Sequence, residues 1–164
     1  MSTLLQSPGA GPSTRAASRS SRGQLDMTFQ LEKRHLGLVR GVVRHHLAWW
    51  GVSGEVAEIV LLAVNELLTN VLVHTSPDEN GWRSASLLVQ HVPGGVTAVV
   101  RDQDPRPIVR KTAAPLDLGG RGLALVRALV DEFSVAMPGE GKDVWFFIAD
   151  PEHHAPQTAE PTES

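Results

Sequence analysis

The sequence predicts a two-layer α/β sandwich (an α+β fold), in which a mixed, largely antiparallel sheet is covered on one face by about three helices. Two long stretches with apolar residues at helical spacing follow one another in the first half of the chain. Two pairs of β-branched or alternating segments are each joined by a short turn that contains Gly and Pro. Because strands joined by tight turns must be antiparallel, this pattern excludes a doubly wound parallel sheet.

The predicted elements follow in the order strand, two helices, two strands, loop, helix and two strands. We expect strands over 25–31, 83–92, 96–101, 133–137 and 143–148, and helices over 32–50, 56–75 and 123–130. Ser53 is expected to cap the second helix. Ser76-Pro77 ends that helix, because proline disfavours helical geometry in the residue before it.

The 164 residues are predicted to form one domain between two tails. Residues 1–23 are rich in Ser, Gly, Pro, Ala and Arg and hold few large apolar side chains. Such a composition does not offset the entropy lost on ordering, so we predict a disordered tail there. The domain is predicted over 24–150, and the polar, Pro-containing stretch 151–164 is predicted to be a second disordered tail.

Composition argues against several classes of function. The net charge is -3, and no basic concentration in the predicted domain indicates direct nucleic-acid binding. The chain has no cysteine, which excludes disulfides and thiolate metal sites and agrees with the cytoplasmic location that we expect. The longest unbroken apolar run, 59–64, is too short to span a bilayer, so no membrane is expected among the partners.

The most informative stretch is 59–75, with the sequence I-V-L-L-A-V-N-E-L-L-T-N-V-L-V-H-T. It is mostly apolar and free of Gly and Pro, which predicts a core helix. Glu66, Asn70 and His74 recur every four residues and therefore form one slanting polar stripe. Two interpretations stay open on this helix alone. The stripe lines a ligand pocket, or it faces solvent as the polar stripes of surface helices do.

Two further polar patches follow in the chain. Asp102 ends a predicted strand, where an aspartate is commonly a turn former. The segment Gly119-Gly120-Arg121-Gly122 opens a predicted helix, where glycines commonly give only a flexible entry.

Taken together, these patches resemble the nucleotide pocket of the GHKL ATPases (gyrase, Hsp90, histidine kinase and MutL type), which share the Bergerat ATP-binding fold. They most resemble the bacterial anti-sigma-factor serine kinases of the actinobacterial type. The resemblance covers about residues 25–150. Its motifs are E-L-L-T-N-V-L-V-H (66–74), V-V-R-D-Q-D-P-R-P (99–107), G-G-R-G-L-A-L-V (119–126) and G-K-D-V-W (141–145).

This resemblance implies ATP and Mg²⁺ as cofactors. It implies that Asn70 gives its amide oxygen to a phosphate-bound Mg²⁺, an ion that demands octahedral oxygen ligation. One turn earlier, Glu66 matches the general base for a serine hydroxyl or water. Asp102 matches the aspartate that accepts a hydrogen bond from the adenine amino group. The residues expected at the phosphates are Gly120, Arg121, Gly122 and Leu123. Arg121 either pairs with a phosphate or faces solvent, and His74 is expected to be structural.

Two functions stay open. The first is an ATP-dependent serine/threonine protein kinase in transcription regulation, which phosphorylates a STAS-type anti-anti-sigma partner and acts as an anti-sigma factor. The second is a nucleotide-binding anti-sigma or adaptor module with little or no kinase activity. Asp104 stands where larger relatives carry a glycine, and the lid over 106–118 is short and Pro-rich, which leaves this second function open. The expected partners are a STAS-domain protein and/or a sigma factor, and a homodimer is left open.

Overall fold

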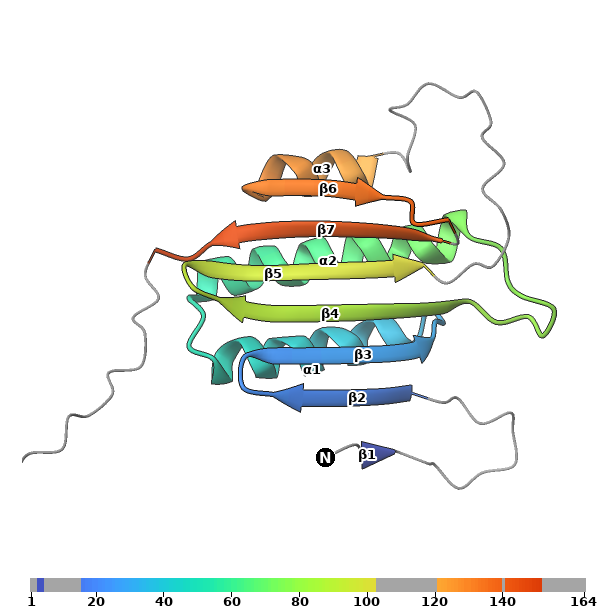
Figure 1. The fold of residues 1–164 in the computed structure, drawn as a ribbon, viewed down its shortest axis with the longest axis horizontal. Coiled ribbons are helices and arrows are strands. Elements are labelled where there is room, and N and C mark those ends of the chain that lie inside the picture. Colours follow the sequence, from blue (N-terminus) through green and yellow to red (C-terminus); the bar gives the residue numbers. More distant parts are fainter. Residues whose placement is uncertain (1–2, 5–15, 103–120, 140, 152–164) are drawn as a thin grey trace, which may run out of the picture.

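The protein is described here from a computed structural model, in which residues 3–4, 16–102, 121–139 and 141–151 are described. A seven-stranded sheet carries the helices on one face (Figure 1). The strands are β1 (Thr3–Leu4), β2 (Ala16–Ser21), β3 (Gln24–Gln30), β4 (Ser84–Val92), β5 (Gly95–Asp102), β6 (Glu132–Ala136) and β7 (Lys142–Ala149). The helices are α1 (His35–Trp49), α2 (Gly54–His74) and α3 (Arg121–Leu129).

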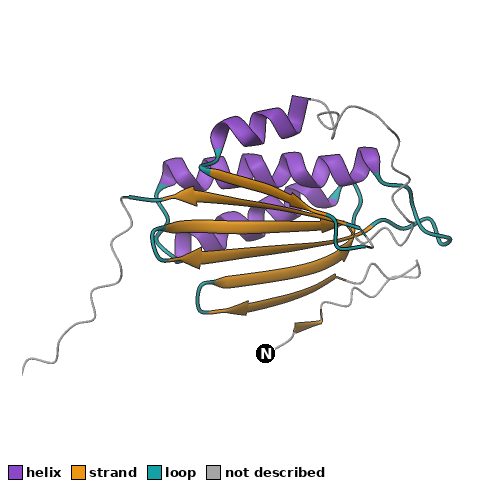
Figure 2. Ribbon diagram, turned by 45° about the horizontal axis from the view of Figure 1, so that its top comes forward, coloured by secondary structure: helices purple, strands orange, loops and turns teal. Residues whose placement is uncertain are grey.

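The sheet has the order β1-β2-β3-β4-β5-β7-β6. Every pairing between the described strands is antiparallel. The sequence predicted a mixed, largely antiparallel sheet, and the described strands contain no parallel pair. Seen from a tilted direction, the three described helices lie on one side of the sheet, and no described helix covers the other side (Figure 2). The predicted two-layer α+β sandwich is therefore confirmed.

The core forms between the helices and the inward face of the sheet. Side chains of a strand point alternately to its two faces, and the buried positions follow that period. On β5, for example, Val96, Ala98, Val100 and Asp102 are buried, and on β7 the buried positions include Val144, Phe146 and Ile148. Asp102 is thus the last member of an otherwise apolar, core-facing row.

Helix α2 is the central element of the helical layer. It packs against α1, α3, β5 and β7. Eight of its residues are buried, which are Val56, Val60, Leu61, Ala63, Val64, Leu67, Leu68 and Val71. By length and composition alone this helix could also cross a membrane. Its buried side chains and its contacts with four elements are those of the core helix of a folded domain.

The start of α2 differs from the expectation at Ser53. Ser53 is the N-cap residue, as predicted, but its side chain makes no capping hydrogen bond. Instead, its backbone N–H donates to Oδ2 of Asp150 at 2.9 Å, and Asp150 follows β7 directly in sequence. A carboxylate next to the first turn also interacts favourably with the positive end of the helix dipole. The end of the sheet therefore caps the central helix.

The N-terminal part of the sheet also differs from the expectation. Ala16–Ser21 was expected within a disordered tail of residues 1–23, but it forms β2 and pairs along its whole length with β3. The side chains of this segment are mostly small and polar, so its sequence carries no strand pattern. Its backbone pairs with the edge that β3 would otherwise expose. The expectations for residues 5–15 and 152–164 lie outside the described residues.

Candidate functional site

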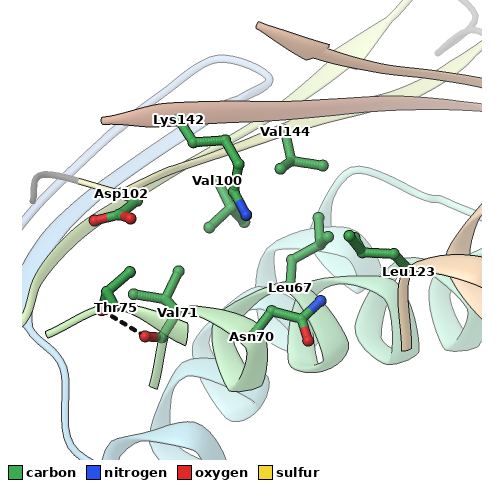
Figure 3. A pocket seen from close by; sticks show the side chains of 9 residues that line it. All are labelled: Leu67, Asn70, Val71, Thr75, Val100, Asp102, Leu123, Lys142 and Val144. Atoms are coloured by element: carbon green, nitrogen blue, oxygen red, sulfur yellow. Dashed lines mark hydrogen bonds between the residues drawn. The ribbon is translucent and has the colours of Figure 1, made fainter. Parts of the chain in front are cut away.

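A pocket opens where the end of α2, the ends of β5 and β7 and the start of α3 meet (Figure 3). Most of its wall is apolar. Its polar lining comes from Asn70 and Thr75 of the α2 segment, from Asp102 of β5 and from Lys142 of β7. The apolar lining residues are Leu67, Val71, Val100, Leu123 and Val144. An apolar pocket with a few convergent polar groups is the usual form of a small-molecule site.

At one end of this pocket the backbone of α3 lies next to the side chains of Glu66 and Asn70 on α2. A Cβ atom placed on Gly122 would lie 2.7 Å from Oε2 of Glu66, 3.6 Å from Oδ1 of Asn70 and 3.8 Å from its Nδ2. The segment has room only for glycine unless Glu66 moves. The structure therefore brings Gly122 against Glu66 and Asn70, although Gly122 lies more than fifty residues after both of them in the sequence.

The first turn of α3 contributes backbone groups at this end. Arg121, Gly122 and Leu123 form that turn, and the first N–H groups of a helix have no partner within the helix. Together with the helix dipole they favour an anionic ligand. Leu123 is buried and lines the pocket. Gly120, Asp104 and the lid over 106–118 lie outside the described residues.

Asn70 has unused hydrogen-bonding capacity at the pocket wall. Its Nδ2 atom is buried and has no hydrogen-bond partner among the described residues. A buried polar group left in this way costs roughly 1–3 kcal/mol, so a functional reason for it is expected. The neighbouring amide oxygen of Asn70 and carboxylate of Glu66 are oxygen donors of the kind that Mg²⁺ prefers. Asn70 therefore fits a magnesium–phosphate ligand, with the Glu66 carboxylate nearby.

Asp102 lies at the other end of the pocket. Its side chain is 8% exposed, at the end of the core-facing row of β5. A buried carboxylate needs a polar or charged neighbour. That neighbour is Lys142, which is paired with Asp102 in the register of β5 and β7. Their opposite charges attract each other across the two strands.

Lys142 is a site residue that sequence reasoning missed. Its partial burial lowers its pKa below the ordinary lysine value, and the attraction of Asp102 opposes this shift. In Figure 3 its side chain extends from β7 into the pocket beside Val100. The signal in the sequence is a lysine two positions before Val144, at the same inward-facing parity as the apolar residues of β7. Recognising it requires the register between β5 and β7.

The remaining predicted positions are placed as follows. His74 is the last residue of α2 and its side chain is exposed, so the polar stripe enters the site only at Glu66 and Asn70. Thr75 lines the pocket, and its hydroxyl donates to the carbonyl oxygen of Val71 at 2.5 Å. This bond continues the end of the helix and fixes the Thr75 side chain (Figure 3).

The chain was compared with protein families, curated proteins and solved structures. A family model described as "Histidine kinase-like ATPase domain" matches residues 29–148. A search of curated proteins found no match. Among solved structures, the chain is similar to the histidine kinase domain of the blue-light activated histidine kinase of Erythrobacter litoralis EL346, at 23% identity and a TM-score of 0.45.

The similar region covers 71% of this chain and 60% of the solved one, so this chain spans about 60% of that structure's length. The family model matches the chain from β3 to β7, and the matched region includes all the residues that line the pocket. The chain therefore belongs to the family of histidine kinase-like ATPase domains, a membership that implies ATP binding.

Proposed function

We propose that this protein is an ATP-binding regulator, an anti-sigma factor with serine kinase activity that phosphorylates a STAS-type anti-anti-sigma partner. The observation that carries the proposal is the convergence of Glu66, Asn70 and the backbone at Gly122 at one end of the pocket. An acid, an amide and a helix N-terminus in contact form a set suited to phosphoryl transfer, in which positioning and charge stabilisation do most of the catalysis.

In this proposal the phosphates of ATP lie against the first turn of α3. The amide oxygen of Asn70 would hold Mg²⁺, which when bound offsets negative charge on the phosphates. Glu66 takes the proton of the partner's serine hydroxyl. The serine oxygen then forms a bond to the γ-phosphorus, and the bond from that phosphorus to the β–γ bridging oxygen breaks, releasing ADP.

Transfer of a labelled phosphate tests this function. The full chain is incubated with γ-labelled ATP, Mg²⁺ and candidate STAS proteins, and label on the partner is measured. We expect transfer by the unmodified protein and a loss of about 100-fold or more in Glu66→Gln, because general-base catalysis is worth roughly 10²–10⁴-fold. Glu55→Gln is the matched control, since Glu55 is an exposed acid in the first turn of the same helix.

The same experiment separates the alternative, an anti-sigma or adaptor module without kinase activity. ATP binding without label on any partner, together with nucleotide-dependent capture of a sigma factor, would favour that module. The departure from the family pattern at Asp104 is the observation that keeps it as the second candidate. Failure of the unmodified protein to bind ATP would overturn both.

A further inference from the structure

We propose that Lys142 is a specificity-determining residue of the nucleotide site, whose ammonium group donates a hydrogen bond to N1 of adenine while Asp102 accepts one from the neighbouring N6 amino group. This inference rests on the proposed ATP-binding function. It adds to that function a donor which, together with the acceptor Asp102, would distinguish adenine from other bases.

The register of the sheet places the donor and the acceptor side by side. Asp102 is paired with Lys142, and Val100 with Val144, in adjacent antiparallel strands. Side chains directly opposite each other in such a pair lie on the same face, with Cβ atoms about 4.5–5.5 Å apart. Since Val100 and Val144 are buried, the two charged side chains belong to the core-facing rows that end at the pocket.

The chemistry of this pair matches one edge of adenine. On that edge the N6 amino group donates and the adjacent N1 accepts, while guanine presents an acceptor and then a donor at the same two places. A carboxylate can only accept and an ammonium can only donate. The order Asp102 then Lys142 therefore favours adenine, and a site built to hydrogen-bond a ligand group rejects analogues that lack it.

The surrounding wall is mostly apolar. Val100, Leu67 and Leu123 are among the apolar residues that line the pocket with Asp102 and Lys142 (Figure 3). Apolar surroundings exclude water and strengthen the hydrogen bonds made within them. The burial that lowers the pKa of Lys142 is a cost to the protein, and a ligand that accepts a hydrogen bond from the ammonium would offset it.

A neighbouring pair on the same two strands provides the structural comparison. Arg101 and Asp143 are also paired in the register, on the opposite face of the sheet. Arg101 donates from Nε and Nη2 to the two carboxylate oxygens of Asp143, both at 2.7 Å. Its side chain is 53% exposed, as expected of a surface ion pair. Lys142 differs because it points into the pocket.

The test compares ATP with 1-deaza-ATP, in which a C–H group replaces N1. Affinities of the full chain are measured by calorimetry with Mg²⁺ present. We expect the unmodified protein to prefer ATP by about tenfold or more, the value of one hydrogen bond to a charged group. In Lys142→Met this preference should fall to about one. The matched control Arg101→Met removes the cation of the neighbouring pair and should keep the original preference.

Each outcome decides the proposal. Equal affinity of the unmodified protein for the two nucleotides overturns the role of Lys142 without any variant, so the test does not depend on the folding of Lys142→Met. A preference that persists in Lys142→Met also overturns it, and in both cases the proposed ATP-binding function still stands. If the unmodified protein binds neither nucleotide, the proposed function and this inference fail together.

Discussion

Gly122 at the start of α3 lies against the carboxylate of Glu66 on α2, and a Cβ atom at position 122 would be 2.7 Å from Oε2 of Glu66. This contact joins two segments that are far apart in sequence, a polar interruption in a core helix and a glycine in the first turn of α3. It also places the acid at the end of the pocket next to the first N–H groups of α3, which have no partner within the helix.

Gly122→Ala should lower ATP affinity by roughly tenfold or more while the protein stays folded. The added methyl group must displace the end of the Glu66 side chain, which is flexible, so the cost falls on the site and not on the core. Calorimetric titration with ATP and Mg²⁺ measures this. Gly41→Ala is the control, because a Cβ at Gly41 meets nothing within 4 Å. That variant should bind normally, and it should gain up to about 1 kcal/mol in stability, since alanine favours a helix interior.

Asn70→Ala should abolish Mg²⁺-dependent ATP binding with little effect on the fold. Its Nδ2 atom makes no hydrogen bond among the described residues, so removing it sacrifices none of those contacts. Binding is measured by calorimetry, and folding by urea denaturation. Asn65→Ala, on the same helix but outside the pocket lining, is the control. Unchanged nucleotide binding in Asn70→Ala would remove Asn70 from the magnesium site.

Asp150→Ala should destabilise the protein by roughly 1–3 kcal/mol, because the backbone N–H of Ser53 loses its partner at the start of α2. Ser53→Ala should change the free energy of unfolding by no more than about 0.5 kcal/mol, since the serine side chain makes no capping bond. Urea denaturation of both variants gives the two values. A larger loss in Ser53→Ala than in Asp150→Ala would contradict this account of the cap.

The lowered pKa of Lys142 predicts a pH-dependent difference in stability. Between its native pKa and the ordinary value of 10.5, the unfolded chain still holds a proton that the native protein has released. The free energy of unfolding therefore rises with pH through this window as far as Lys142 is concerned. Lys142→Met lacks this contribution. Urea denaturation of both proteins is measured at several alkaline pH values. As the pH rises, the free energy of unfolding of the unmodified protein should increase relative to that of Lys142→Met. A difference between the two proteins that does not change with pH would contradict the lowered pKa of Lys142.

The sequence predicted most of the fold because its main elements carry local signals. The apolar period of α2 and the turns at 93–95 and 138–142 depend only on neighbouring residues. β2 was not predicted because its sequence does not alternate between apolar and polar residues. It forms a strand because its backbone pairs with the edge of β3. Predictions based on composition are blind to such pairing.

In the candidate site, too, residues with a local sequence signal were predicted, and residues that depend on contacts between distant segments were not. Glu66 and Asn70 were found because two polar groups one turn apart stand out in an apolar helix. Lys142 was missed because its importance depends on lying opposite Asp102, forty residues earlier, in the register of two strands. Asp150 was missed for the same reason, since a side chain that follows the last strand caps a helix near residue 53. Contacts between distant segments decide both positions.

The place of β7 between β5 and β6 has a consequence for how the protein is made. β7 is nearest the C-terminus among the described strands, yet it is an interior strand, and it brings both Lys142 and the Asp150 carboxylate that caps α2. A nascent chain that has emerged only as far as β6 lacks one wall of its nucleotide pocket and the cap of its central helix. Completion of the pocket thus requires residue 150 to emerge from the ribosome, and a message truncated before β7 should yield a product unable to retain nucleotide.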